Sequence, residues 1–199
     1  MYDWRKMNEN ERAQAVLIRR AHRYPDHSPP HWNPQGEHQY LISAACYEHT
    51  SIIGKNPERM TAFTGALLEA CRLFCIEIDA WCVLPNHYHL LVLTKTIVEL
   101  RRSLGQHHGR SSFQWNGEDQ ARGRKVWHNC FERSMQSESH YWVTINYIHH
   151  NPVKHGHVQH WQEWPWPSAQ GFLEQMGRDR AIKLWQEYPI LDYGKKWDL

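Results

Sequence analysis

The chain has 199 residues, of which 41% are hydrophobic and 22% are charged, a composition typical of a soluble globular protein. The mean hydropathy of -0.77, with no long apolar run, argues against a membrane span, and no apolar stretch near Met1 suggests a secretory signal. Because the formal net charge is only +2, any binding of nucleic acid would depend on local basic patches.

The first 36 residues are expected to precede the main folded domain. Residues 9–20 have the composition of a short helix, and a proline-rich segment at 25–34 follows them. Proline fixes φ and lacks a backbone N–H, so this segment cannot hold regular structure. We therefore expect an N-terminal extension at 1–36, a folded domain at 37–160 and a tryptophan-rich C-terminal extension at 161–199.

The folded domain is expected to alternate strands and helices. Strands are predicted at 39–46, 74–83, 87–93 and 126–135, and helices at 57–71, 94–107 and 137–151, the last ended by Pro152. Glycines and polar residues at 109–124 predict a mobile loop. The order β-α-β-β-α-β-α favours the α+β class, as a ferredoxin-like antiparallel sheet with helices on one face.

Two histidines open one of the predicted strands. Side chains alternate along a strand, so His87 and His89 point to the same face, where two imidazoles can hold a metal ion. Chance pairs are common in a chain with 16 histidines. A second pair, His155 and His157, follows a helix end in a polar stretch, and we interpret its side chains as solvent-exposed. His87 and His89 differ because they lie in an apolar strand, where buried polar groups need a reason.

A second group of polar residues lies on the helix predicted at 137–151. Tyr147 and Asn151 are one turn apart and share a face. Tyr141, Ile145 and Ile148 form the apolar stripe expected to pack on the sheet, and Tyr147 lies off that stripe. Tyr147 could therefore be a reactive phenol or a tyrosine at the packing edge, and Asn151 could simply end the helix before a proline.

The two motifs together resemble a known family. The segments LPNHYHLLV, at 84–92, and NYIHHNPVKHG, at 146–156, are similar to those of the REP-associated tyrosine transposases. These proteins are a branch of the single-tyrosine HUH endonucleases, named for a histidine-hydrophobic-histidine motif. The resemblance covers roughly residues 37–167 and implies that the catalytic domain is an HUH endonuclease core.

The resemblance implies a role for each matching residue. His87 and His89 correspond to the metal-binding pair, Tyr147 to the nucleophile, and Asn151 to a third metal ligand on the helix. The implied cofactor is Mg²⁺ or Mn²⁺, although histidine also suits Zn²⁺. Rolling-circle initiators of the same superfamily carry a lysine near the position of Asn151, whereas here Lys154 lies further along, which favours the transposase branch.

The implied substrate is single-stranded DNA that carries hairpins of the repetitive extragenic palindrome (REP) type. Lys154 is a candidate contact to a substrate phosphate, and the cluster of Arg122, Arg124 and Lys125 in a glycine-containing loop is a second candidate. Both could equally be solvated surface charges. Most of the 11 tryptophans are expected to pack in the core, and a minority could stack on bases.

The leading hypothesis is thus an enzyme that cuts and rejoins single-stranded DNA through a 5′-phosphotyrosine. The alternatives are a sheet that binds single-stranded nucleic acid without cutting it, and a metal-dependent hydrolase that uses water. Relatives of the REP-associated branch suggest a monomer, with a dimer as the other option. Five cysteines without paired spacing predict free thiols, and we expect a cytoplasmic protein of a bacterial nucleoid with no membrane partner.

Overall fold

The computed structural model describes residues 8–11, 13–14, 17 and 36–194. Gly36–Tyr193 form one compact unit, and Met1–Gln35 with Gly194–Leu199 form another. In the second of these, residues 9–11, 13–14 and 17 are helical, and the backbone N–H groups of Asn8 and Glu11 each donate to the other's side chain. This reciprocal cap begins the helix predicted at 9–20. The rest of that helix and the proline-rich segment lie outside the described residues.

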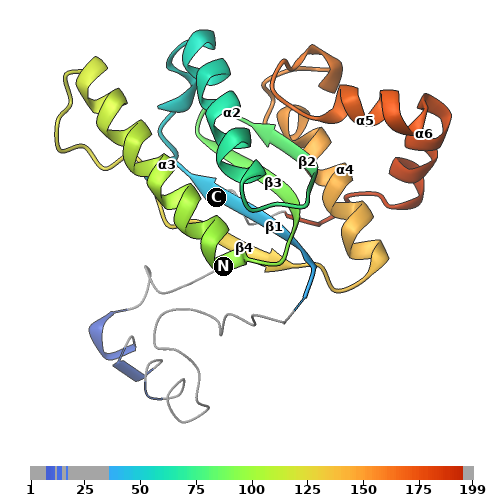
Figure 1. Cartoon of the computed structure of the whole chain (residues 1–199), viewed down its shortest axis with the longest axis horizontal. Helices are drawn as coiled ribbons and strands as arrows, with labels where there is room; N and C mark the ends of the chain where they lie inside the picture. Colours follow the sequence, from blue (N-terminus) through green and yellow to red (C-terminus); the bar gives the residue numbers. More distant parts are fainter. Residues whose placement is uncertain (1–7, 12, 15–16, 18–35, 195–199) are drawn as a thin grey trace. The chain divides into compact units, whose positions relative to one another are not determined.

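A four-stranded antiparallel sheet forms the centre of the Gly36–Tyr193 unit (Figure 1). Its strand order is β2-β3-β1-β4. Helix α2 (Pro57–Arg72) connects β1 to β2, and helix α3 (Ile97–Glu118) connects β3 to β4. This is the ferredoxin-like β-α-β-β-α-β arrangement, so the predicted fold class is confirmed. The strands are β1 (His38–Ala45), β2 (Glu77–Val83), β3 (His87–Thr94) and β4 (Phe131–Ser134).

One face of the sheet packs against helices α2 (Pro57–Arg72) and α3 (Ile97–Glu118). Alternate residues of β1 and β3 point into this core because side chains alternate along a strand. From the strands the core includes Tyr40, Ile42, Ala44, Tyr88, Leu90 and Val92, and from the helices Phe63, Leu67, Leu100 and Leu104. These are the helices that the sequence predicted on one face.

The opposite face carries α4 (Glu138–Lys154), an arrangement that the sequence prediction did not include. Leu41 and Leu91 point to this face and are fully buried, and so are Ile145 and Ile148 of α4. Two of the three residues of the predicted apolar stripe are thus buried on the sheet as expected, and the third, Tyr141, is half-buried. The placement of α4 matters for function because His87 and His89 also point to this face.

Helix α3 is eleven residues longer at its C-terminal end than the predicted helix at 94–107, so the predicted mobile loop at 109–124 is wrong over residues 109–118. A glycine costs a helix only about 1 kcal/mol relative to alanine, and tertiary packing overrides such a cost. The packing here is a buried stripe at helical spacing that continues past the glycines. It consists of Leu100, Leu104, His108, Ser111 and Trp115.

Two predicted strands are shorter than expected. β2 begins at Glu77 rather than at residue 74, because the N–H groups of Phe74 and Cys75 donate to the carbonyl of Cys71 and close the end of α2. β4 covers only Phe131–Ser134 of the predicted 126–135. Trp127 is buried in the core but makes only an isolated bridge to the end of β1.

Helix α4 continues through Pro152 to Lys154, although the sequence predicted that it ends at Asn151. The N–H groups of His155, Gly156 and His157 donate to the carbonyls of Asn151, Val153 and Pro152, respectively. Gly156 has a φ of 70°, the left-handed conformation that glycine favours. This is a Schellman ending, which satisfies the last carbonyls of the helix and fixes the direction of the chain beyond it.

The tryptophan-rich segment beyond α4 packs along β2. The N–H of Val83 donates to the carbonyl of Trp166, and the indole N–H of Trp164 donates to the carbonyl of Val83. Helices α5 (Ala169–Met176) and α6 (Arg178–Glu187) follow and lie beside α4 in Figure 1. No described helix is long and apolar enough to span a membrane, and all five cysteines are free.

A buried ion pair ties the end of α3 to the start of α2, and we expect its loss to destabilise the fold. Arg59, with a side chain only 5% exposed, lies 2.7 Å from Asp119, which also accepts from Arg124 at 2.7 Å. Asp119→Ala leaves Arg59 with only the more exposed Glu118 as an acidic partner and is expected to lower the free energy of unfolding by about 3 kcal/mol in urea denaturation. The exposed pair Arg72–Glu69 supplies the control, since Glu69→Ala should change stability by less than about 1 kcal/mol.

The same carboxylate gives this stabilisation a pH dependence. The hydrogen bond from Arg59 holds the pKa of Asp119 below its usual range. The stabilisation is therefore present above the unfolded-state pKa and is lost as the pH falls through the lower folded-state pKa. An equal loss of stability in the Asp119 and Glu69 variants would contradict the role of this ion pair.

Candidate active site

The histidine pair lies at the start of β3, on the face that α4 covers. His87 and His89 are 4% and 1% exposed, and their ring centroids are 5.1 Å apart. In the β1–β3 register, Ala45 is the partner of His87 and Ser43 is the partner of His89. The alternation predicted from the sequence therefore places both imidazoles together beneath one helix.

Each imidazole is oriented through its Nδ1 atom. Nδ1 of His87 lies 2.7 Å from Oδ1 of Asn86, and Nδ1 of His89 lies 2.6 Å from Oγ of Ser43. Because an amide oxygen can only accept, His87 donates from Nδ1 and presents Nε2 as an acceptor. The same tautomer of His89 donates to Ser43. A hydrogen bond that leaves Nε2 as the acceptor is how proteins prepare histidine to bind a metal.

Helix α4 brings Tyr147 and Asn151 to this pair. The phenol oxygen of Tyr147 is 3.3 Å from Nε2 of His89, and Oδ1 of Asn151 is 3.2 Å from Nε2 of His87. One helical turn separates the two side chains, so a single face of α4 delivers both. All four residues that the sequence singled out by two separate motifs thus meet at one point of the structure.

The donor set at this point suits a divalent cation. Nε2 of His87 and Oδ1 of Asn151 are both hydrogen-bond acceptors, so no proton links them. A cation bound by both atoms would make their close approach favourable. Nδ2 of Asn151 is buried and has no hydrogen-bond partner among the described residues, which fits a side chain held for its oxygen. Among those residues no group of three or more His, Cys, Asp or Glu is placed to hold a metal. The candidate ligands are therefore two imidazoles and one amide.

Tyr147 is fully buried, which differs from the sequence-based alternative of an edge tyrosine with its hydroxyl in water. Its ring lies at an angle of 77° to that of Tyr193, with centroids 5.6 Å apart, and Nζ of Lys154 lies 4.6 Å from its centroid. Tyr193 is held in turn by Thr144 and by His140, whose Nε2 is 3.0 Å from the Tyr193 hydroxyl. His140 thus helps to hold Tyr193 against the ring of Tyr147.

The other tyrosine of this helix is poorly suited to attack a phosphate. The hydroxyl of Tyr141 donates to Oδ1 of Asp79 at 3.0 Å. Burial, and then the nearby charge of Asp79, raise the pKa of Tyr141 above its ordinary value. Burial also raises the pKa of Asp79, to about 6. Tyr141 therefore holds its proton more firmly than an exposed tyrosine, whereas Tyr147 faces an imidazole.

Comparison with known proteins identifies the family of the chain. The sequence profile of the family described as "Transposase IS200 like" matches residues 38–151. The chain belongs to the IS200-like transposase family. It therefore belongs to a class of DNA-processing enzymes, and the matched range includes the first motif, the second motif as far as Asn151, and all of the sheet.

Two individual relatives refine the comparison. A Haemophilus influenzae protein, named as a REP-associated tyrosine transposase, is 28% identical over 138 residues, which are 61% of this chain and 78% of that protein. A solved structure, "Structure of the REP associates tyrosine transposase bound to a REP hairpin", matches with a TM-score of 0.55 and 21% identity over 82% of this chain and 88% of that one. The resemblance inferred from the two motifs is confirmed, and the structural match supports the fold.

Several polar residues at the site of this IS200-like transposase were not singled out from the sequence. Ser43 and Asn86 orient the histidines, and Tyr193 covers Tyr147. Only Asn86, next to His87 in the chain, carried a signal that could have been read. Finding Ser43 requires the strand register, and finding Tyr193 requires the path of the C-terminal segment.

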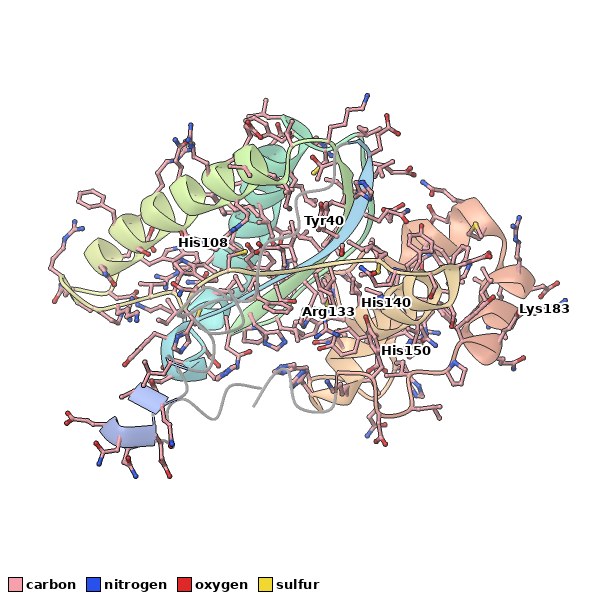
Figure 2. All side chains as sticks on the ribbon, turned by 90° about the horizontal axis from the view of Figure 1, so that it is seen from below. Tyr40, His108, Arg133, His140, His150 and Lys183 are labelled. Atoms are coloured by element: carbon pink, nitrogen blue, oxygen red, sulfur yellow. The ribbon has the colours of Figure 1, made fainter. Side chains whose placement is uncertain are left out.

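The two histidines that follow Ile148 on α4 differ in burial: His149 is buried and His150 is half-buried. His149 is fully buried, and its Nε2 lies 3.1 Å from Oγ of Ser168, in the segment along β2. Burial and the neighbouring His150 lower the pKa of His149 to about 3, so its ring is neutral. Figure 2 shows His140 and His150 on α4, with Arg133 of β4 near His140. Burial, and then Arg133, lower the pKa of His140.

The predicted basic cluster contacts α3 and the turn after β1. Arg122 donates to the carbonyl of Phe113 at 2.7 Å, Arg124 pairs with Asp119, and Nζ of Lys125 lies 4.5 Å from the ring centroid of Tyr47. These contacts explain how the loop is held. Arg122 and Lys125 remain exposed, so their roles as DNA contacts stay predictions.

Proposed function

We propose that this transposase cleaves and rejoins single-stranded DNA at REP-type hairpins through a 5′-phosphotyrosine on Tyr147. The observation that carries the proposal is the meeting of Tyr147 and Asn151, both from α4, with the two Nε2 atoms of His87 and His89. A phenol next to a set of nitrogen and oxygen ligands is the arrangement that a tyrosine nucleophile requires.

Each step of the proposed chemistry breaks one P–O ester bond and forms another, so the number of ester bonds is unchanged. The oxygen of Tyr147 attacks the scissile phosphorus, the bond to the 3′ oxygen breaks, and that oxygen leaves as a hydroxyl after taking up a proton. The phenol proton passes to solvent, because Nε2 of His89, 3.3 Å from the phenol oxygen, is proposed as a metal ligand. In the reverse step a DNA 3′ hydroxyl attacks the phosphotyrosine and Tyr147 leaves as a phenol. Rejoining therefore needs no nucleotide cofactor.

The proposed cofactor is Mg²⁺ or Mn²⁺, with His87, His89 and Asn151 as its ligands. When bound, the cation would neutralise charge on the scissile phosphate and orient it for attack. Two imidazoles and one amide oxygen leave coordination positions for phosphate oxygens and water, as a catalytic site requires. The hydrogen bonds from Ser43 and Asn86 would keep both ligand nitrogens aimed at the ion.

Nucleophile and metal ligands come from one chain, which supports a monomer that works in cis, with a dimer as the alternative. Since Tyr147 is fully buried, entry of DNA requires that covering side chains such as Tyr193 move. Lys154, exposed beside Tyr147, is proposed to contact a substrate phosphate, and Arg122, Arg124 and Lys125 are proposed to contact DNA further away. This activity belongs in the cytoplasm, on the nucleoid.

The proposed substrate follows from the relatives. The solved structure that matches this fold has a REP hairpin bound, and the Haemophilus influenzae protein is named as REP-associated. The test is a denaturing gel of the purified protein with a labelled single-stranded hairpin, with and without Mn²⁺ or Mg²⁺. A metal-dependent band of slower mobility supports the proposal. Cleavage without an adduct would indicate hydrolysis by water, and binding without cleavage would indicate a binding module.

Removing the support of a metal ligand should weaken the reaction without abolishing it. Asn86→Ala removes the acceptor for Nδ1 of His87, so the imidazole loses its fixed tautomer. Loss of such a supporting hydrogen bond typically costs 10- to 100-fold in metal affinity or activity, and we expect a loss of that order in adduct formation. Raising the Mn²⁺ concentration should restore part of it. An adduct rate equal to that of the wild type would contradict the proposed role of Asn86.

A further inference from the structure

A row of aromatic rings leads from the candidate active site to the surface. The centroid of His155 is 4.9 Å from that of His87, His157 is 6.3 Å from His155, and Trp164 is 5.3 Å from His157. Trp166 follows, 5.1 Å from Trp164. We call His155, His157, Trp164 and Trp166 the ring row. Its inner end, His155, thus contacts His87, a proposed metal ligand.

The backbone holds the ring row firmly in place. His155, Gly156 and His157 form the Schellman ending of α4, and the left-handed Gly156 lies between the two histidines. At the outer end, the indole N–H of Trp164 donates to the carbonyl of Val83, and that of Trp166 donates to Oγ1 of Thr61. Side chains held in advance lose little conformational freedom when a ligand binds.

Exposure differs along the row in a way that packing alone does not explain. Trp164 and Trp166 are half-buried and pack against the core. His157 is exposed, yet its ring stacks on Trp164 with an angle of only 27° between the planes. An exposed ring adds little to the burial of the core, so this stack presents an aromatic face to solvent at the edge of the candidate active site.

We propose that the ring row is a stacking track for the unpaired bases next to the scissile phosphate. Single-stranded nucleic acid is commonly bound by aromatic side chains that stack on successive bases, with cationic groups contacting its backbone. Lys154, at the inner end of the row, is such a cationic group. The bases of a duplex have their faces covered, so the track would select unpaired nucleotides. This inference rests on the proposed function.

The test measures DNA binding apart from chemistry, in full-length protein carrying Tyr147→Phe with a metal chelator present. Fluorescence anisotropy compares a bare DNA hairpin with hairpins that carry a short single-stranded extension on the 5′ or the 3′ side. His157→Gln keeps polarity but removes the ring, and His157→Phe keeps a ring. His160→Gln, at an exposed histidine outside the row, is the position control.

One of the two extended hairpins, with its extension on the 5′ or the 3′ side, should bind more tightly than the bare hairpin. His157→Gln should weaken binding of that extended probe by roughly tenfold, since stacking of one base contributes on the order of 1–3 kcal/mol. His157→Phe and His160→Gln should retain the gain, and all variants should bind the bare hairpin equally. Thermal unfolding of the variants should be unchanged.

Two results would overturn the track. One is equal binding of the extended probes by His157→Gln and its parent protein, and the other is an equal loss on the bare hairpin, which would indicate a general defect. If wild type still forms the covalent adduct in either case, the proposed function stands and only the track is refuted. If the parent protein binds no hairpin, the proposed function fails and the track fails with it.

Discussion

Tyr147→Phe is expected to abolish covalent capture of DNA and to leave hairpin binding nearly unchanged. The substitution removes one oxygen and keeps the ring that packs against His89 and Tyr193. Loss of a nucleophile removes the covalent step itself, so adduct formation should fall by at least about 10⁴-fold. The phenol's hydrogen bond to His89 contributes on the order of 1 kcal/mol, so the fold should persist. A denaturing gel with labelled hairpin DNA measures the adduct.

Two neighbouring tyrosines supply matched controls for this variant. Tyr141→Phe breaks the hydrogen bond to Asp79 on the same helix, and Tyr193→Phe breaks the bonds to Thr144 and His140. Neither oxygen is next to the histidine pair, so both variants should still form the adduct. Loss of the adduct in Tyr141→Phe, with retention in Tyr147→Phe, would show that the nucleophile has been assigned to the wrong tyrosine.

His87→Ala and His89→Ala are each expected to remove metal-dependent cleavage. Each substitution deletes one of three proposed ligands and also leaves a half-buried hydrogen-bond partner, Asn86 or Ser43, without its imidazole. Activity should fall by at least about 100-fold, beyond the range typical for a lost supporting hydrogen bond, because a ligand itself is gone. The rate of adduct formation across a series of Mn²⁺ concentrations provides the measurement.

The control for the histidine variants is His160→Ala. His160 is exposed and lies immediately before the η4 turn (Trp161–Glu163). It should cleave like the wild type at every metal concentration. Removing a buried imidazole also costs packing, so circular dichroism is needed to check the fold. All three variants should be folded. Cleavage retained by the double variant His87→Ala/His89→Ala would refute the metal assignment.

The parts of the site that lie within one element could be predicted from the sequence. The period of two in a strand places His87 and His89 on one face, and the period of 3.6 in a helix places Tyr147 and Asn151 on another. The β-α-β-β-α-β order was likewise enough to predict the ferredoxin-like sheet. These predictions succeed because they depend only on local geometry, and the resemblance to a family linked the two motifs.

The parts that depend on tertiary contacts could not be predicted. Ser43 supports His89 only because β1 and β3 pair in one particular register. The length of α3 depends on a buried stripe that outweighs its glycines, and His149 is buried because Ser168 lies along β2. His155 was interpreted as a solvent-exposed side chain, but its ring lies 4.9 Å from that of His87, next to the left-handed Gly156 at the end of α4.

The central claim, a covalent bond between DNA and Tyr147, is tested most directly by locating the bond. The adduct formed with a hairpin in Mn²⁺ can be digested with nuclease and protease, and the modified peptide sequenced by mass spectrometry. The account predicts a nucleotide remnant on the phenol oxygen of Tyr147. A remnant on Tyr141, Tyr193 or a serine would contradict it.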